Sequence, residues 1–138
     1  NIQEIISAQQ QPSPAQTDYL LRHYIKYRGQ DSPETNLFGT QFINYVAANT
    51  RQFINSTAKP QQKATLLRDL IVNDETFTEV RIKALTEKLR NKPELLKVLR
   101  EERKQVVRYY STYTESQVKR LTSFFDKIDS LLGIKPLR

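Results

Sequence analysis

Apolar residues recur every three or four positions along most of the chain, the spacing that places them on one face of an α-helix. No stretch shows the alternation of apolar and polar residues that indicates a half-buried β-strand, and no internal repeat of fixed period is present. The pattern therefore predicts an all-α fold. Because the connections are short, neighbouring helices are expected to run antiparallel, as a helical bundle of about five helices.

Serine–proline pairs mark where the first two long helices of this prediction begin. Ser13-Pro14-Ala15-Gln16 combines an N-cap serine, a proline at the first helical position and a glutamine three residues after the cap. The helix is expected to end near Gly29, because glycine is favoured just beyond a helix C-terminus. Ser32-Pro33 starts the next helix in the same way. The predicted inward faces are Leu20, Leu21, Tyr24 and Ile25 in the first helix, and Phe38, Phe42, Tyr45, Val46 and Phe53 in the second.

Two further helices are predicted between residues 60 and 90. Pro60 opens the first of them, and Asn73-Asp74 ends it. Thr76 and Glu79 have the spacing of a capping box, which predicts a helix through about Arg90. The inward face of the helix that starts at Pro60 is predicted to consist of Leu66, Leu67, Leu70 and Ile71.

The last predicted helix is the longest. It starts at Pro93, and at about 100° per residue one apolar seam continues without a phase break until Gly133 and Pro136 end it. A helix of about 40 residues would be a rod of roughly 60 Å. Thr114 and Gln117 also have capping-box spacing, so a kink near Ser111–Thr114 is the alternative, but the unbroken seam favours a straight helix. The seam residues are Leu95, Leu99, Val106, Tyr110, Tyr113, Leu121, Phe124, Ile128 and Leu131.

The composition adds limits to this picture. A chain of 138 residues fits one domain, and we expect an N-terminal arm or short helix at 1–12 followed by a single helical-bundle domain at 13–138. The absence of cysteine and the single histidine leave no pattern of metal ligands, and three glycines leave no glycine-rich phosphate loop, so no cofactor is predicted. The first residue is not methionine, and both a cytoplasmic and a processed or exported location remain open.

The positive charge is concentrated in one part of the chain. The whole chain has a net charge of +7, and the window 81–120, with twelve Lys or Arg and five Asp or Glu, also has a net charge of +7. Four cations of this window lie within about 80° of one another on the helical wheel, opposite the apolar seam. One interpretation is that they solvate the exposed face of a long helix. The other is that they bind an acidic partner or a phosphate backbone. The four residues are Lys97, Arg100, Lys104 and Arg108.

Polar residues interrupt the apolar seam of the same helix. Arg103 and Gln117 point the same way as the seam, and Glu102 lies at its edge. Because a buried arginine without a partner is costly, Arg103 is expected to meet a carboxylate or carbonyl groups, or to mark where the helix leaves the bundle. It could belong to a polar layer that fixes helix register, or to an interface left uncovered at residues 100–104.

The only histidine lies in an aromatic row. Tyr19, His23 and Tyr27 are four residues apart and point away from the apolar face of their helix. The row predicts either packing against a second helix or a surface recognition patch. Catalysis by His23 is disfavoured, because no motif supplies a nucleophile or a carboxylate pair beside it.

These patterns favour a non-catalytic protein–protein interaction module with an adaptor, regulatory or assembly role and an acidic protein as its partner. The partner-binding residues are predicted to be the four cations, Arg103 and the aromatic row. A homodimer that completes the seam is an alternative. Others are a nonspecific nucleic-acid binder and a regulatory or sensory domain of a larger, exported or membrane-anchored protein. Membrane binding is disfavoured, because a bundle core needs the same aromatic seam.

Overall fold

The computed structural model describes residues 2–28 and 33–134, without the side chains of residue 3 and residues 33–38. Within these ranges every regular element is helical and no strand occurs, which confirms the all-α class. The elements are α1 (Ile2–Ser7), α2 (Pro14–Tyr27), α3 (Pro33–Ala48), α4 (Thr50–Ile54), α5 (Pro60–Asn73), α6 (Glu79–Glu87), α7 (Pro93–Arg108), a 3-10 turn η1 (Tyr110–Thr112) and α8 (Glu115–Leu131).

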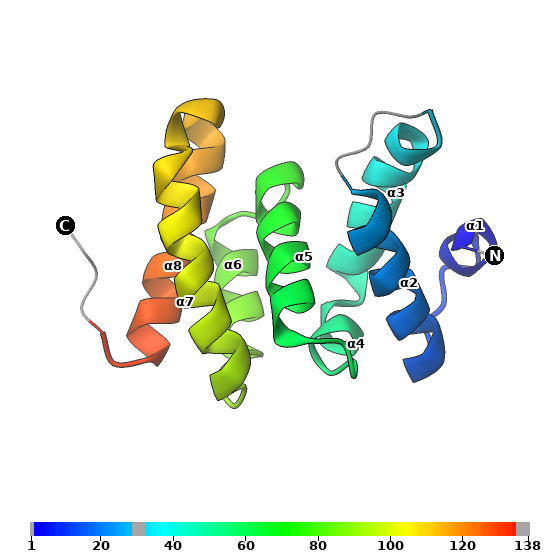
Figure 1. Ribbon diagram of the computed structural model, residues 1–138, viewed down its shortest axis with the longest axis horizontal. Helices are drawn as coiled ribbons and strands as arrows, with labels where there is room; N and C mark the ends of the chain where they lie inside the picture. The colour runs from blue at the N-terminus through cyan, green and yellow to red at the C-terminus, as the bar shows by residue number, and fades with distance from the viewer. Residues whose placement is uncertain (1, 29–32, 135–138) are drawn as a thin grey trace.

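The helices form a row of antiparallel pairs in two layers (Figure 1). In the view of the figure, α2, α5 and α7 form the front layer, and α3, α6 and α8 lie behind them. Within the layers α2 contacts α5, α5 contacts α7 and α6 contacts α8, and α7 and α8 pack against each other as the last pair. The short helix α1 lies at the opposite end of the row, against α3.

The predicted C-terminal helix of about 40 residues is wrong. The chain turns back after Arg108, and α8, the longest helix among the described residues, has 17 residues. Thr114 caps α8 in a reciprocal capping box: its Oγ1 accepts from the Gln117 N–H at 3.2 Å, and its own N–H donates to Gln117 Oε1 at 2.9 Å. The apolar seam could not reveal the turn, because both helices of an antiparallel pair bury their apolar faces against common neighbours. Leu99, Val106, Leu121, Phe124 and Ile128 are all buried, whereas Tyr110 and Tyr113 at the turn are only half-buried.

Most of the predicted helix starts are confirmed. Helices begin at all four predicted prolines (14, 33, 60 and 93), and Ser13 and Gln16 form the predicted capping box. Thr76 does not cap α6. Its backbone N–H donates to the Asp74 carboxylate at 2.9 Å, and Thr78 is the N-cap.

Several predicted helix ends are different in the structure. The helix predicted to reach Arg90 ends at Glu87, and the predicted second helix is interrupted at Asn49, between α3 and α4. The predictions for Gly29, Ser32, Pro136 and the Phe38 side chain lie outside the described residues.

Arginine–carboxylate pairs connect the helices of the front layer. Between α2 and α5, Arg28 binds Asp69 with two hydrogen bonds of 2.8 and 2.9 Å, and Tyr24 donates to the same carboxylate at 2.6 Å. Burial and the nearby Asp69 raise the pKa of the Tyr24 hydroxyl. Between α5 and α7, Arg68 pairs with Glu102 at 2.9 Å. In both cases an arginine from the earlier helix meets a buried carboxylate on the next helix of the row.

Candidate interaction surface

The inner side of α7 is occupied by contacts within the chain. Arg103 Nη2 lies 3.2 Å from an Asp126 oxygen, and Arg103 Nη1 pairs with Asp129, a residue that is 3% exposed. This confirms the prediction that Arg103 meets a carboxylate. Glu102 is also buried, and it accepts a hydrogen bond from Gln61 at 2.8 Å in addition to its pair with Arg68. Arg103 therefore connects α7 to α8, and the structure separates it from the other cations of its helix.

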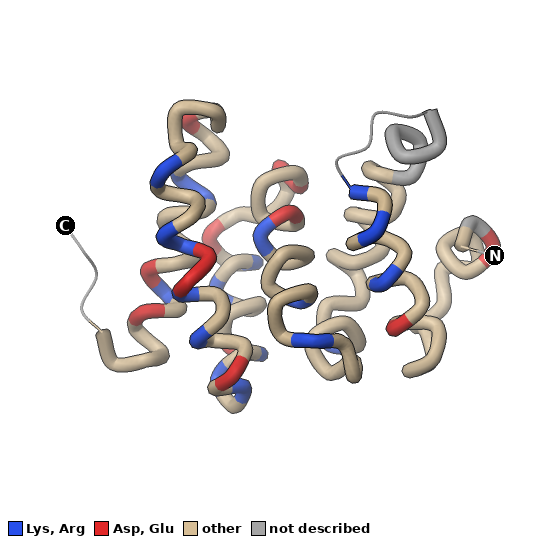
Figure 2. The backbone as a smooth tube through the Cα atoms, in the orientation of Figure 1, with Lys and Arg blue, Asp and Glu red and all other residues tan. Residues whose placement is uncertain are grey.

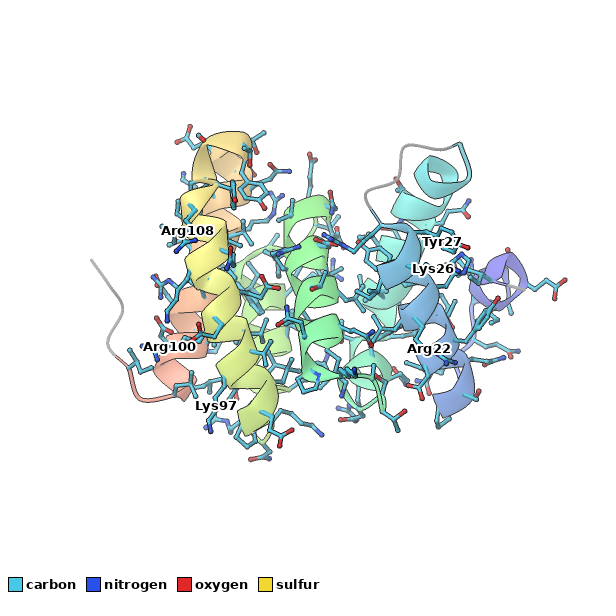
Figure 3. All side chains as sticks on the ribbon, in the orientation of Figure 1. Arg22, Lys26, Tyr27, Lys97, Arg100 and Arg108 are labelled. Carbon is cyan, nitrogen blue, oxygen red and sulfur yellow. The ribbon has the colours of Figure 1, made fainter. Side chains whose placement is uncertain are left out.

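The outer side of α7 carries the four cations predicted from the sequence, which we call the α7 stripe: Lys97, Arg100, Lys104 and Arg108. All four are exposed. Lys104 lies 3.3 Å from Glu101, in a pair whose side chains are 64% and 65% exposed. Such an exposed i,i+3 pair contributes little to stability. No described residue lies within hydrogen-bond or ion-pair distance of the other three cations. Figure 2 shows basic positions along α7, and Figure 3 labels three residues of the stripe.

The α7 stripe faces away from α5, at the end of the row of helices that α7 and α8 form. Glu102 faces α5 through its pair with Arg68. Arg100 and Lys104, each two residues from Glu102, lie about 200° around the helix from it. In Figure 3 the labelled Arg100 and Arg108 lie on the side of α7 that faces away from α5. No other described helix follows α7 in the front layer (Figure 1).

The two edges of the α7 stripe differ in chemistry. Glu94 and Glu101, seven residues apart and both exposed, lie along one edge. Val107, which is 50% exposed, lies at the other edge, three residues after Lys104. Tyr109, which is 56% exposed, follows at the C-terminal end of α7. Val107 was not predicted from the sequence. Its position off the apolar seam, three residues after Lys104 and next to Arg108, was the signal that could have identified it.

The aromatic row of α2 forms a contiguous line of rings. The ring centroids of Tyr19 and His23 are 6.2 Å apart, and those of His23 and Tyr27 are 4.5 Å apart. Lys26 Nζ lies 5.2 Å from the centre of the Tyr27 ring. Burial and the charge of Lys26 lower the pKa of His23. The sequence analysis missed the exposed Arg22 and Lys26, each three residues after an aromatic residue of the row, as Figure 3 shows for α2.

The structure does not bring the α2 row and the α7 stripe together. Their helices are separated by α5 in the front layer, and the labelled residues of the two groups lie toward opposite ends of the molecule (Figure 3). A partner that contacts only α7 therefore does not reach α2. We treat the α7 stripe as the main candidate surface because three of its cations have no partner among the described residues.

Residues 2–28 and 33–134 contain no group of three or more His, Cys, Asp or Glu side chains that could hold a metal ion. In this part of the chain, no helix combines the length and apolar character needed to cross a bilayer. Comparison of the chain with protein-family models, characterised proteins and solved structures found no match.

Proposed function

We propose that this chain is a non-catalytic protein–protein interaction module that binds an acidic partner protein through the α7 stripe. The observation that carries the proposal is the division of the basic residues of α7. Arg103 is held by two carboxylates of α8, whereas Lys97, Arg100 and Arg108 have no partner among the described residues. Uncompensated cations on one helix face attract a surface of opposite charge and speed its association.

Binding of a second copy through the same stripe is opposed by charge. A symmetric dimer would bring four cations against the same four cations. The residues outside the window 81–120 have a net charge of zero, so they provide no excess negative charge for the stripe of a second copy. A different, acidic protein is therefore favoured as the partner.

Nonspecific nucleic-acid binding is the second candidate. The exposed Tyr109, which follows Arg108 in the sequence, favours it, because unpaired bases stack on exposed aromatic rings. The exposed carboxylates of Glu94 and Glu101 along the stripe argue against it, since they repel phosphates.

Zero-length cross-linking in an extract of the source cells tests the proposal. A carbodiimide joins a lysine amine directly to a carboxylate, so products at Lys97 and Lys104 would identify acidic residues of the partner. We expect these products with the wild-type chain and their loss in the variant R100E/R108E, which keeps both lysines. The matched control, R51E/R90E, reverses two exposed arginines elsewhere in the chain and lowers the net charge by the same amount. Equal yields from the two variants would contradict the proposal.

A further inference from the structure

Two arginine–carboxylate pairs join successive helices of the front layer. Arg28, the C-cap residue of α2, pairs with Asp69 of α5, and Arg68 of α5 pairs with Glu102 of α7. Each helix thus offers an arginine to a carboxylate on the next one. On α7, Arg103 pairs with Asp129 of α8. The cations that point away from α5 belong to the α7 stripe. The position that would supply their carboxylates is that of the next helix in the layer.

We propose that the partner docks an acidic amphipathic α-helix along α7, as the next helix of the front layer. The inference rests on the proposed function and specifies the form of the partner. The docking helix presents a single row of carboxylates to the α7 stripe. One edge of that row is apolar and contacts Val107, and the other edge is basic and faces Glu94 and Glu101.

The spacing of the cations fits a helical partner better than an extended one. Successive members of the stripe are three, four and four residues apart, so at about 1.5 Å per residue the row is roughly 16 Å long. Carboxylates on one face of a second helix recur at the same steps of about 4.5–6 Å. Same-side residues of an extended chain recur about every 6.7 Å, so four of them span about 20 Å and accumulate a mismatch of about 4 Å.

The edges of the stripe favour a narrow acidic row over a uniformly negative ligand. A phosphate backbone brings negative charge to both edges and meets Glu94 and Glu101 unfavourably. An amphipathic helix can place acidic, basic and apolar residues in separate rows. Exposed ion pairs alone give little affinity, so the half-exposed Val107 supplies an apolar contact on the edge opposite the two glutamates.

Fluorescence anisotropy with three labelled peptides of identical composition tests the inference. The row peptide is an alanine-based helix with four glutamates at the spacing of the stripe, a leucine beside that row and lysines on the other side. The scrambled peptide distributes the same residues around the helix. The third peptide has the order of the row peptide but is built with alternating D- and L-residues, so that it cannot form an α-helix. We expect the row peptide to bind the full chain about tenfold more tightly than either control peptide, the effect of two or three exposed pairs.

Reversal of the charges at Lys104 and at the facing position of the peptide tests whether these two positions are in contact. The variant Lys104→Glu should bind the row peptide about fivefold more weakly, and a peptide with lysine at the facing position should restore the affinity. Lys83→Glu, on α6, serves as the control and should leave the affinity unchanged. Equal affinity for the row and scrambled peptides would overturn the helical inference while leaving the proposed function standing. If no acidic peptide binds, both fail, and tighter binding of a single-stranded oligonucleotide than of the row peptide assigns the stripe to nucleic acid.

Discussion

Arg103 and Arg100 lie three residues apart on α7 but have different surroundings. The Arg103 side chain is 13% exposed and is held by Asp126 and Asp129 of α8. Arg100 is exposed at the end of the row, and no described residue pairs with it. The same residue type on one helix thus meets a neighbouring helix on one side and solvent on the other.

The comparison separates charges that hold the helices together from charges that are available for recognition. A buried ion pair contributes little net stability as a pair, but removal of one partner leaves an uncompensated charge away from water. Removal of an exposed cation changes the free energy of unfolding very little. Such a cation affects the association rate and the choice of partner instead. Substitution of Arg103 is therefore expected to change the free energy of unfolding, and substitution of the α7 stripe is expected to change partner affinity.

Removal of Arg103 should have the largest effect on stability. The variant Arg103→Ala leaves Asp129 buried with no cation, and we expect a loss of about 3–5 kcal/mol in the free energy of unfolding. The control, Arg100→Ala, should change it by less than about 0.5 kcal/mol. Urea unfolding followed by circular dichroism measures both. Similar losses for the two variants would remove the distinction between the two sides of α7.

The turn between α7 and α8 brings Asp129 back to Arg103. Thr114, the N-cap residue of α8 that follows this turn, should contribute measurably to the free energy of unfolding. Thr114→Ala removes the acceptor for the Gln117 N–H, and we expect a loss of about 1 kcal/mol in the free energy of unfolding. Ser111→Ala, an exposed position in the 3-10 turn, is the control and should have a smaller effect. If the two substitutions had the same effect, the capping box would not explain the turn.

Removal of Glu101 should weaken binding of the row peptide slightly. Glu101 lies at the edge of the α7 stripe, where its exposed pair with Lys104 contributes little and where the lysines of the row peptide are expected to face it. Because Glu101→Gln removes the attraction to those lysines, we expect the row peptide to bind about twofold more weakly, with the free energy of unfolding unchanged. Tighter binding of this variant, measured by anisotropy, would contradict a basic edge of the partner at Glu101.

The smallest effect is expected on α2, where the lowered pKa of His23 gives stability a pH dependence. Because the pKa of His23 is lowered in the folded chain, the unfolded chain binds its proton more readily. The contribution of His23 to stability is therefore complete above its unfolded pKa of about 6.5 and declines as the pH falls through the lowered value. The difference in unfolding free energy between the wild type and His23→Gln should shrink from pH 7.5 to pH 5. A constant difference would contradict this assignment.

Local chemistry made part of the fold predictable. The prolines at 14, 33, 60 and 93 and the capping box at Ser13 and Gln16 act within one helical turn, and the structure contains each of them at a helix start. The Thr114–Gln117 box gave the same local signal for α8. It was outweighed by the continuous apolar seam, which is equally compatible with one long helix and with two helices folded against each other.

The contacts on the inner side of α7 could not be predicted from sequence spacing. Arg103 pairs with Asp129 across 26 positions, and Arg68 pairs with Glu102 across 34. The apolar pattern showed that Arg103 was turned inward but not which carboxylate it would meet. By contrast, the exposure of the α7 stripe followed from the helical wheel alone, because it lies opposite the seam.

The most direct test measures affinity and stability on one preparation of the variant K97E/R100E/K104E/R108E. We expect this variant to bind the row peptide at least about tenfold more weakly than the wild type, while its urea midpoint stays within error of the wild-type value. Retained affinity would contradict the assignment of recognition to the outer side of α7. A large fall in the midpoint would show instead that the stripe holds the fold together.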